Sequence, residues 1–321
     1  MRRASLIIHP HELSREWIAR MKENKIPTLA LHPVGGKSAA RSFAELLKLV
    51  ETKEFRALID EAADAGLYIE YEMHAVRTLL PESEFAEHPE WFRMNEDGER
   101  VTDYNLCSSN PEAMDYLAER VADAARRLYK STDRYFFWTD DAKDSFCHCE
   151  ACRAFSPSDQ QMKILNHVLR RLRRDNPKAS LAYLAYYDSL TPPEKIKPDD
   201  GIFLEYAPYE RDFSRPLCES VDGENLERLV RVFGKGRAKA LDYWYDNSCF
   251  SGYKKPPKEL KANAAVIAAD FEYYESLGFE DISSFACYLG RDYEELYGAP
   301  DISAFAGEYH KRNKTREEEK I

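Results

Sequence analysis

The most constraining feature of the sequence is a regular alternation of short apolar runs with long amphipathic segments. Short runs rich in β-branched and aromatic residues predict strands, and apolar residues at i, i+3, i+4 spacing predict helices. The expected strands cover residues 5–9, 28–32, 67–74, 134–140, 180–187, 201–206, 238–245 and 281–288. The expected helices between them cover residues 13–23, 55–65, 112–129, 159–174, 225–233 and 263–277.

Strands that alternate with helices are typical of a parallel sheet, and eight of them favour closure into a (β/α)8 TIM barrel. We therefore expect one α/β domain over residues 1–310, a long inserted loop at 75–108 and a charged flexible tail at 311–321. An open doubly wound sheet is the alternative. However, no glycine-rich nucleotide-binding motif follows any expected strand. Gly66 and Gly278 are expected to end helices in the left-handed conformation, and Ser158-Asp159 is expected to begin one.

The composition limits the partners. The formal net charge of −11 argues against nucleic acid, because a phosphate backbone binds basic surfaces. No apolar run approaches the roughly 18 residues that a membrane helix needs. The N-terminal apolar run is too short for a signal peptide, so we expect a cytoplasmic protein without a membrane partner. The sequence does not indicate an oligomeric state.

In a (β/α)8 barrel, the residues that follow the carboxyl ends of the strands converge on one site. Here they are mostly carboxylates and aromatic residues, which suits a carbohydrate better than a phosphate ester. Any single tyrosine among them can equally be a filler of the barrel interior. The candidate substrate-binding residues are His32, Glu72, His74, Tyr186, Tyr187, Glu205, Tyr206, Asp242, Trp244, Tyr245 and Tyr288, and Gly35-Gly36 also follow a strand.

Asp140-Asp141, at the end of the strand that contains YFFW, is the candidate catalytic pair. Neighbouring residues of a strand face opposite sides, so both carboxylates reach a site only where the strand is ending. Two like charges this close should raise the pKa of one of them. Cleavage of a glycoside needs a protonated acid beside a second, negative group.

Several segments resemble a known family. EYEMHAVRTLLP, HPEWFRMNEDGERV, NLCSSNPEAMDYLAERV and the run from YFFWTDDAKDSFCHCEAC to LRRLRR are similar to domain of unknown function 4838. Members of that family have been classified as glycoside hydrolase family 163. It resembles the barrel β-N-acetylhexosaminidases of glycoside hydrolase families 20 and 84, in which an acidic pair ends the fourth strand.

The resemblance implies a β-N-acetylglucosaminidase in which the substrate's acetamide oxygen attacks the anomeric carbon. Asp140 would orient the acetamide, Asp141 would be the general acid and then the base, and no cofactor would be required. Two alternatives remain open. One is a glycosidase for a non-acetamido or uronic-acid glycoside that uses Asp141 with Asp242 or Glu205. The other is a barrel that binds carbohydrate without catalysis.

The cysteines form a separate pattern. Cys147, Cys149 and Cys152 lie in CHCEAC, and Cys107 lies in the preceding insertion. Four thiolates can hold a structural zinc ion, although the usual form is two paired C-x-x-C knuckles. Free thiols and a disulfide are the alternatives.

Overall fold

The computed structural model describes residues 3–129 and 132–318. Eight parallel strands form a closed barrel in the order β1 to β8, which confirms the predicted (β/α)8 architecture. All eight strands were predicted, and most end one to three residues earlier than expected. They are β1 (Arg3–Ile8), β2 (Thr28–Leu31), β3 (Tyr68–His74), β4 (Arg134–Trp138), β5 (Ser180–Ala185), β6 (Ile202–Tyr206), β7 (Ala238–Asp242) and β8 (Asp281–Phe285).

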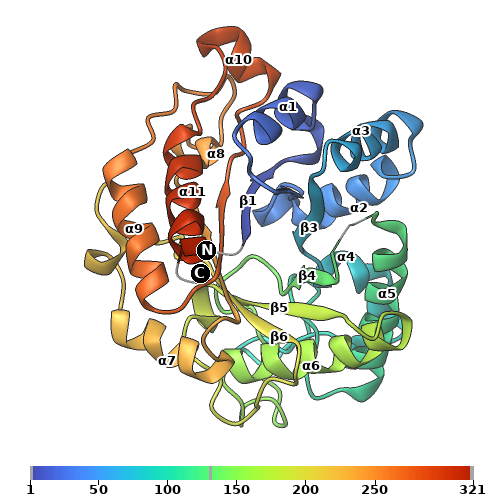
Figure 1. Ribbon diagram of the computed structural model, residues 1–321. Helices are drawn as coiled ribbons and strands as arrows, with labels where there is room; N and C mark the ends of the chain where they lie inside the picture. The colour runs from blue at the N-terminus through green and yellow to red at the C-terminus, as the bar shows by residue number, and fades with distance from the viewer. Residues whose placement is uncertain (1–2, 130–131, 319–321) are drawn as a thin grey trace. The chain divides into compact units, whose positions relative to one another are not determined.

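The helices follow the strands along the chain (Figure 1). Six of them correspond to predicted helices, whereas α2, α4, α8, α10 and α11 were not predicted. Their bounds are α1 (Arg15–Glu23), α2 (Ala39–Leu49), α3 (Lys53–Asp64), α4 (Val76–Leu79), α5 (Pro111–Arg127), α6 (Pro157–Asp175), α7 (Gly223–Phe233), α8 (Asn247–Phe250), α9 (Ala264–Ser276), α10 (Arg291–Tyr297) and α11 (Ser303–Glu318).

Residue contacts divide the barrel chain into two compact units. The first holds the segment that ends at His32, together with Arg56–Glu70 and the segment that begins at Glu205. The second holds Pro33–Phe55 and Tyr71–Leu204. In the first unit α9 packs against α11, and in the second α5 packs against α6 (Figure 1).

The strands read as nearly continuous apolar runs because both of their faces are covered. Every residue of β2, β4 and β7 is buried, as expected for parallel strands enclosed by helices. The register is parallel, with Leu6 opposite both Leu29 and Ser284 in the first unit. In the second unit, Met73 lies opposite Phe137.

Helix ends follow the local chemistry of the sequence, with one correction. Helix α6 begins at Pro157, after the cap Ser156, whose hydroxyl accepts a hydrogen bond from the Asp159 N–H. The predicted start at Ser158-Asp159 was therefore two residues too late, because Ser156 has the extended backbone that a cap requires. Gly66 and Gly278 have φ values of 86° and 90°, as expected for the residues that end α3 and α9.

The insertion after β3 and the C-terminal segment also differ from expectation. The insertion contains α4 and two antiparallel bridges, Phe92 with Leu106 and Met94 with Arg100, and it continues until α5 begins at Pro111. Helix α11 continues to Glu318 across most of the segment predicted as a flexible tail. Residues 319–321 of that prediction lie outside the described residues.

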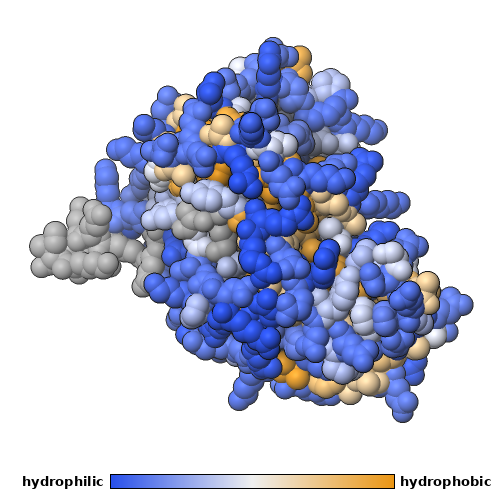
Figure 2. All heavy atoms as spheres, turned by 90° about the vertical axis from the view of Figure 1, so that its right-hand side faces the viewer, coloured by the Kyte–Doolittle hydropathy of each residue, from blue (hydrophilic) through white to orange (hydrophobic). Residues whose placement is uncertain are grey.

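The face of the molecule in Figure 2 is mostly hydrophilic, and apolar side chains appear there only in small areas. This agrees with a chain in which 32% of the residues are charged. Within residues 3–129 and 132–318, no helix combines the length and the apolar character that crossing a bilayer requires.

Candidate active site

Asp140 and Asp141 lie where the chain leaves β4, two and three residues after its last residue, Trp138. The Ala142 N–H donates to the Asp140 carbonyl over 3.0 Å, which turns the chain immediately after the pair. This turn breaks the alternation of a strand, so the two carboxylates need not face opposite sides. The same unit supplies Gly36, His74 and Arg77, and we call these five residues the aspartate site.

Asp140 is the more buried of the two acids. Its Oδ1 accepts a hydrogen bond from the Arg77 backbone N–H over 3.2 Å. Its Oδ2 is buried, and no donor among the described residues reaches it. Burial raises the pKa of Asp140 to about 6, while the Arg77 N–H and the nearby His74 and Arg77 charges partly oppose the shift.

The neighbouring charge of Asp141 is the smallest of the causes that shift the Asp140 pKa. The prediction that one pKa is raised therefore holds, but its reason was wrong. Exclusion of water matters more than repulsion within the pair, because a carboxylate without water and with few donors favours the neutral form.

Asp141 lies in a different environment, although it is the next residue in the chain. Its side chain is 18% exposed. Its Oδ2 accepts a 2.6 Å hydrogen bond from the Gly36 N–H, and His74 Nε2 lies 3.9 Å from the same oxygen. Gly36 follows β2 and has a φ of 60°, which a residue with a side chain adopts only with strain. The glycine thus allows a backbone donor to face Asp141.

His74, the last residue of β3, is held in one orientation. Its Nδ1 lies 2.6 Å from the Thr139 carbonyl oxygen. A carbonyl can only accept, so Nδ1 carries the hydrogen and Nε2 faces Asp141. The Thr139 hydroxyl in turn donates to Gln161, whose amide donates to the Leu184 carbonyl at the end of β5. Helix α6 thus braces the ends of two strands behind the pair.

Asn105 connects the insertion to the aspartate pair. Its Oδ1 accepts from the Asp140 N–H over 2.9 Å. Its Nδ2 donates to the carbonyl and the hydroxyl of Ser145, over 3.2 and 3.0 Å. Asn105 and Arg77 could not be predicted as site residues, because both contact Asp140 from the insertion, whose path no local pattern reveals.

Aromatic rings from the same unit lie near His74. The His74 ring is 5.1 Å from Trp138 and 6.2 Å from Tyr186, and Tyr186 is 4.0 Å from Tyr187. Both tyrosines are partly exposed. Glu72, another candidate on β3, is fully buried within the strand. Tyr186 and Tyr187 therefore remain candidates to contact a sugar, and Glu72 is better placed to support the barrel interior.

The candidates of the other unit fall into two groups. Glu205 forms a buried 2.7 Å ion pair with Lys239, and Asp242 accepts a hydrogen bond from the Tyr274 hydroxyl over 2.9 Å. Asp242 also lies 3.6 Å from the Arg211 guanidinium. The side chains of Glu205 and Asp242 are completely inaccessible, so the structure does not favour either of them as the second acid of the alternative glycosidase.

The aromatic candidates at the end of β6 and after β7 pack against helices rather than lie open. Tyr206 packs edge-on to Tyr274. Trp244 stacks on Phe271, and its indole N–H donates to Asp270 over 2.8 Å. Tyr245 is fully buried against Phe305 of α11. A cavity of about 260 Å³ next to Trp244 is also lined by Phe213, Ser214, Phe250, Lys261, Asn263 and Val266.

His32 and Tyr288 belong to a histidine-rich group that the sequence analysis missed. His9 Nδ1 lies 2.8 Å from the His32 carbonyl, and the His9 ring is 6.1 Å from Tyr288. The ligand atoms of His9, Glu12 and Cys287 all lie within 4.8 Å of one another, close enough to hold a metal ion. The HPHE motif directly after the first strand was the sequence signal for this group.

Burial raises the pKa of Glu12 to about 7 and lowers that of His9 to about 4, because it disfavours the charged form of each group. Among the described residues, Glu12 Oε1 is buried without a hydrogen-bond partner.

A second group able to hold a metal consists of Cys107, Cys147, Cys149 and Cys152, all buried and none in a disulfide. The insertion supplies Cys107, and the loop between β4 and α6 supplies the other three. The predicted grouping of these four thiols is confirmed, and the disulfide alternative is not supported.

The fold and the paired acids define the class of this protein: a (β/α)8 barrel with two adjacent carboxylates after its fourth strand. The chain belongs to the DUF4838 family, a domain of unknown function whose pattern matches residues 40–284. This confirms the resemblance of the quoted motifs. No curated protein matches the sequence significantly.

Glycoside hydrolases are among the solved structures with a similar fold. An O-GlcNAc hydrolase mutant from Thermobaculum terrenum superposes with a TM-score of 0.53 at 11% identity, over 90% of this chain and 55% of that one. A catalytic module of the pneumococcal exo-β-D-N-acetylglucosaminidase StrH gives 0.51 at 10% identity, over 96% and 83%. A family 5 glycoside hydrolase from Prevotella bryantii, in complex with a xyloglucan tetradecasaccharide, gives 0.50 at 13% identity, over 93% and 86%. At these identities the likeness establishes the fold.

Proposed function

We propose that this protein is a glycoside hydrolase that cleaves β-linked N-acetylglucosaminides with Asp140 and Asp141. The observation that carries the proposal is the contrast within this pair. Asp140 is buried, has a raised pKa, and carries an oxygen that no donor among the described residues reaches, whereas Asp141 is partly exposed and held by a backbone donor. Adjacent carboxylates in unlike environments are the arrangement that acid–base cleavage of a glycoside needs.

The roles follow from exposure and hydrogen bonding. Asp141 is the more accessible acid, so it donates a proton to the leaving glycosidic oxygen. Asp140, as the carboxylate, accepts a hydrogen bond from the N–H of the substrate's 2-acetamido group. The acetamide oxygen then attacks the anomeric carbon as the bond to the leaving group breaks, which gives a cyclic oxazolinium ion. Asp141 next takes a proton from water, and that water opens the ring.

The other residues of the aspartate site, together with Asn105, position these groups. The Gly36 N–H and His74 restrict Asp141, and Arg77 and Asn105 restrict Asp140. Two of the similar structures are named as enzymes that act on N-acetylglucosamine residues. Those names support the choice of substrate, while the carboxylate pair supports the reaction.

The first test compares two aryl β-glycosides that differ only at C2, one with an acetamido group and one with a hydroxyl. We expect hydrolysis of the acetamido substrate and at least a hundredfold lower kcat/KM for the hydroxyl substrate, because the latter lacks the attacking oxygen. Equal rates would contradict participation of the acetamide. Absence of hydrolysis, with sugars still raising the melting temperature, would favour a barrel that only binds carbohydrate.

Substrates that differ in their leaving group distinguish the roles of the two acids. An aryl group that leaves readily as its anion needs no proton, so Asp141→Asn should retain much of its activity on a dinitrophenyl substrate and lose it on a poorer leaving group. Asp140→Asn should be slow on both substrates, since its role is in the attack of the acetamide. The reverse pattern would exchange the two assignments.

A further inference from the structure

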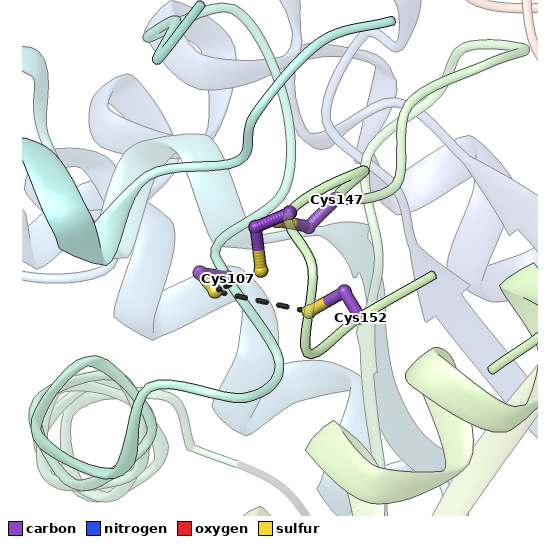
Figure 3. A group of neighbouring side chains, drawn as sticks. Cys107, Cys147 and Cys152 are labelled. Atoms are coloured by element: carbon purple, nitrogen blue, oxygen red, sulfur yellow. Dashed lines mark hydrogen bonds between the residues drawn. The ribbon is translucent and has the colours of Figure 1, made fainter. Parts of the chain in front are cut away.

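The sulfur atoms of Cys107, Cys147, Cys149 and Cys152 converge on one point, which burial of thiols in an apolar core does not require. Cys107 Sγ lies 3.6 Å from Cys149 Sγ and 3.8 Å from Cys152 Sγ. All four sulfurs lie within 4.8 Å of one another. Figure 3 shows the sulfurs of Cys107 and Cys152 pointing toward each other from two separate segments of the chain.

We propose that these four cysteines bind one structural zinc ion. A zinc–thiolate bond is about 2.3 Å long, so the sulfurs at the corners of a ZnS₄ tetrahedron are about 3.8 Å apart. The Cys107–Cys149 and Cys107–Cys152 sulfur separations, 3.6 and 3.8 Å, match that edge. A disulfide would bring one pair of sulfurs to about 2 Å. A cluster of several irons would spread its thiolates, because they bind different metal atoms.

The surroundings of the sulfurs also suit thiolates on a metal. Cys147 Sγ accepts a hydrogen bond from the Met94 N–H over 3.3 Å and lies 3.7 Å from Arg100 Nη1. The hydroxyl oxygens of Ser108 and Ser109 lie 3.5 and 3.2 Å from Cys152 Sγ. Four thiolates with one Zn²⁺ carry two negative charges in a buried place. The Arg100 guanidinium and the Met94 N–H stabilise them, as outer partners commonly do at metal sites.

The ion would close the insertion onto the loop that follows β4. Cys107 lies two residues after Asn105, and Cys147 lies two residues after Ser145. Asn105 and Ser145 are hydrogen-bonded to each other, and Asn105 also accepts from the Asp140 N–H. The zinc would therefore fix both segments next to the contact that positions Asp140. The sulfur geometry indicates this zinc site whether or not the protein is a glycosidase.

The test measures metal content directly. Protein purified without added metal should contain about one zinc per chain by mass spectrometry of the elements. Cys107→Ser should lose most of this zinc and melt at a lower temperature. The matched control Cys218→Ser removes an exposed cysteine outside the group and should keep both the zinc and the melting temperature.

A titration of the wild-type protein covers the case in which Cys107→Ser does not fold. A mercurial reagent added in steps should react first with exposed Cys218 and release no zinc. It should then release one zinc as the four grouped thiols react, as followed with a chromogenic zinc indicator. Thiols that all react without releasing zinc would overturn the proposal, and so would iron in place of zinc in the purified protein.

Discussion

The burial of Asp140 makes a prediction about stability that can be separated from catalysis. Asp140→Asn removes a carboxylate that is buried away from water in the folded protein. Its Oδ2 has no hydrogen-bond partner among the described residues. Burial raises the Asp140 pKa from 3.8 to about 6. At 1.36 kcal/mol per unit, this corresponds to a cost of about 3 kcal/mol for ionising Asp140 in the folded state.

The sign follows from proton binding. Between pH 4 and pH 6 the folded wild type holds the Asp140 proton more tightly than the unfolded chain does, so its stability falls as the pH rises. The Asn variant lacks this dependence. The free energy of unfolding of the variant minus that of the wild type should therefore become more positive by up to about 3 kcal/mol from pH 4 to pH 7.

The assay is urea unfolding of both proteins at pH 4, 5, 6 and 7, followed by circular dichroism. Any fixed cost of burying an amide shifts the whole curve and leaves its slope unchanged. The control Asp97→Asn removes one negative charge from an exposed position and corrects for the general effect of net charge. A difference between Asp140→Asn and wild type that stays constant across this pH range would refute the reasoning.

Three other predictions follow from single contacts. With an N-acetylglucosaminide, kcat/KM should fall below a pH of about 6, because protonation removes the acceptor on Asp140; a flat pH profile from 4 to 7 would contradict this. Gly36→Ala should cost roughly 1 kcal/mol of stability, because φ is 60° at this position. It should also lower kcat, because the Gly36 N–H donates to Asp141. The control Gly307→Ala, within α11, should be neutral or stabilising in thermal melts. Glu205→Gln should cost about 3–5 kcal/mol, because it removes the negative charge that lies 2.7 Å from the buried Lys239 ammonium. Adding Lys239→Met should recover part of that loss in denaturant titrations.

Strand and barrel predictions succeeded because parallel strands covered on both faces leave a strong local signal. Strands covered on both faces are buried at every residue, as TLAL and RYFFW are. Such strands are apolar at most positions, so they can be recognised in the sequence without knowledge of their neighbours in space. Helix α11 gave no such signal. Its buried Phe305, Ala306 and Tyr309 are few beside Gly307 and a mostly charged C-terminal half, and the helix packs against α9.

The candidate site was predicted in part. The ends of β3 and β4 identified His74, Asp140 and Asp141, because a polar residue that ends an apolar strand is visible in the sequence. The packing of Trp244 could not be predicted from the sequence. β7 ends at Asp242, and only the path of the chain after this residue decides that the Trp244 ring stacks on Phe271 of α9. The sequence also did not show that burial, rather than repulsion by Asp141, is the main cause of the raised Asp140 pKa. The burial of Asp140 depends on residues that are far from it in the sequence.

The most direct test of the account is the kcat/KM of four proteins on one aryl N-acetyl-β-glucosaminide whose leaving group requires protonation. The wild type and Asp97→Asn should hydrolyse it at equal rates. Asp140→Asn and Asp141→Asn should each be slower by about 100-fold or more, while circular dichroism shows them folded. A folded variant of either aspartate that stays within a few-fold of wild type would contradict the claim that the two carboxylates act together in glycoside cleavage.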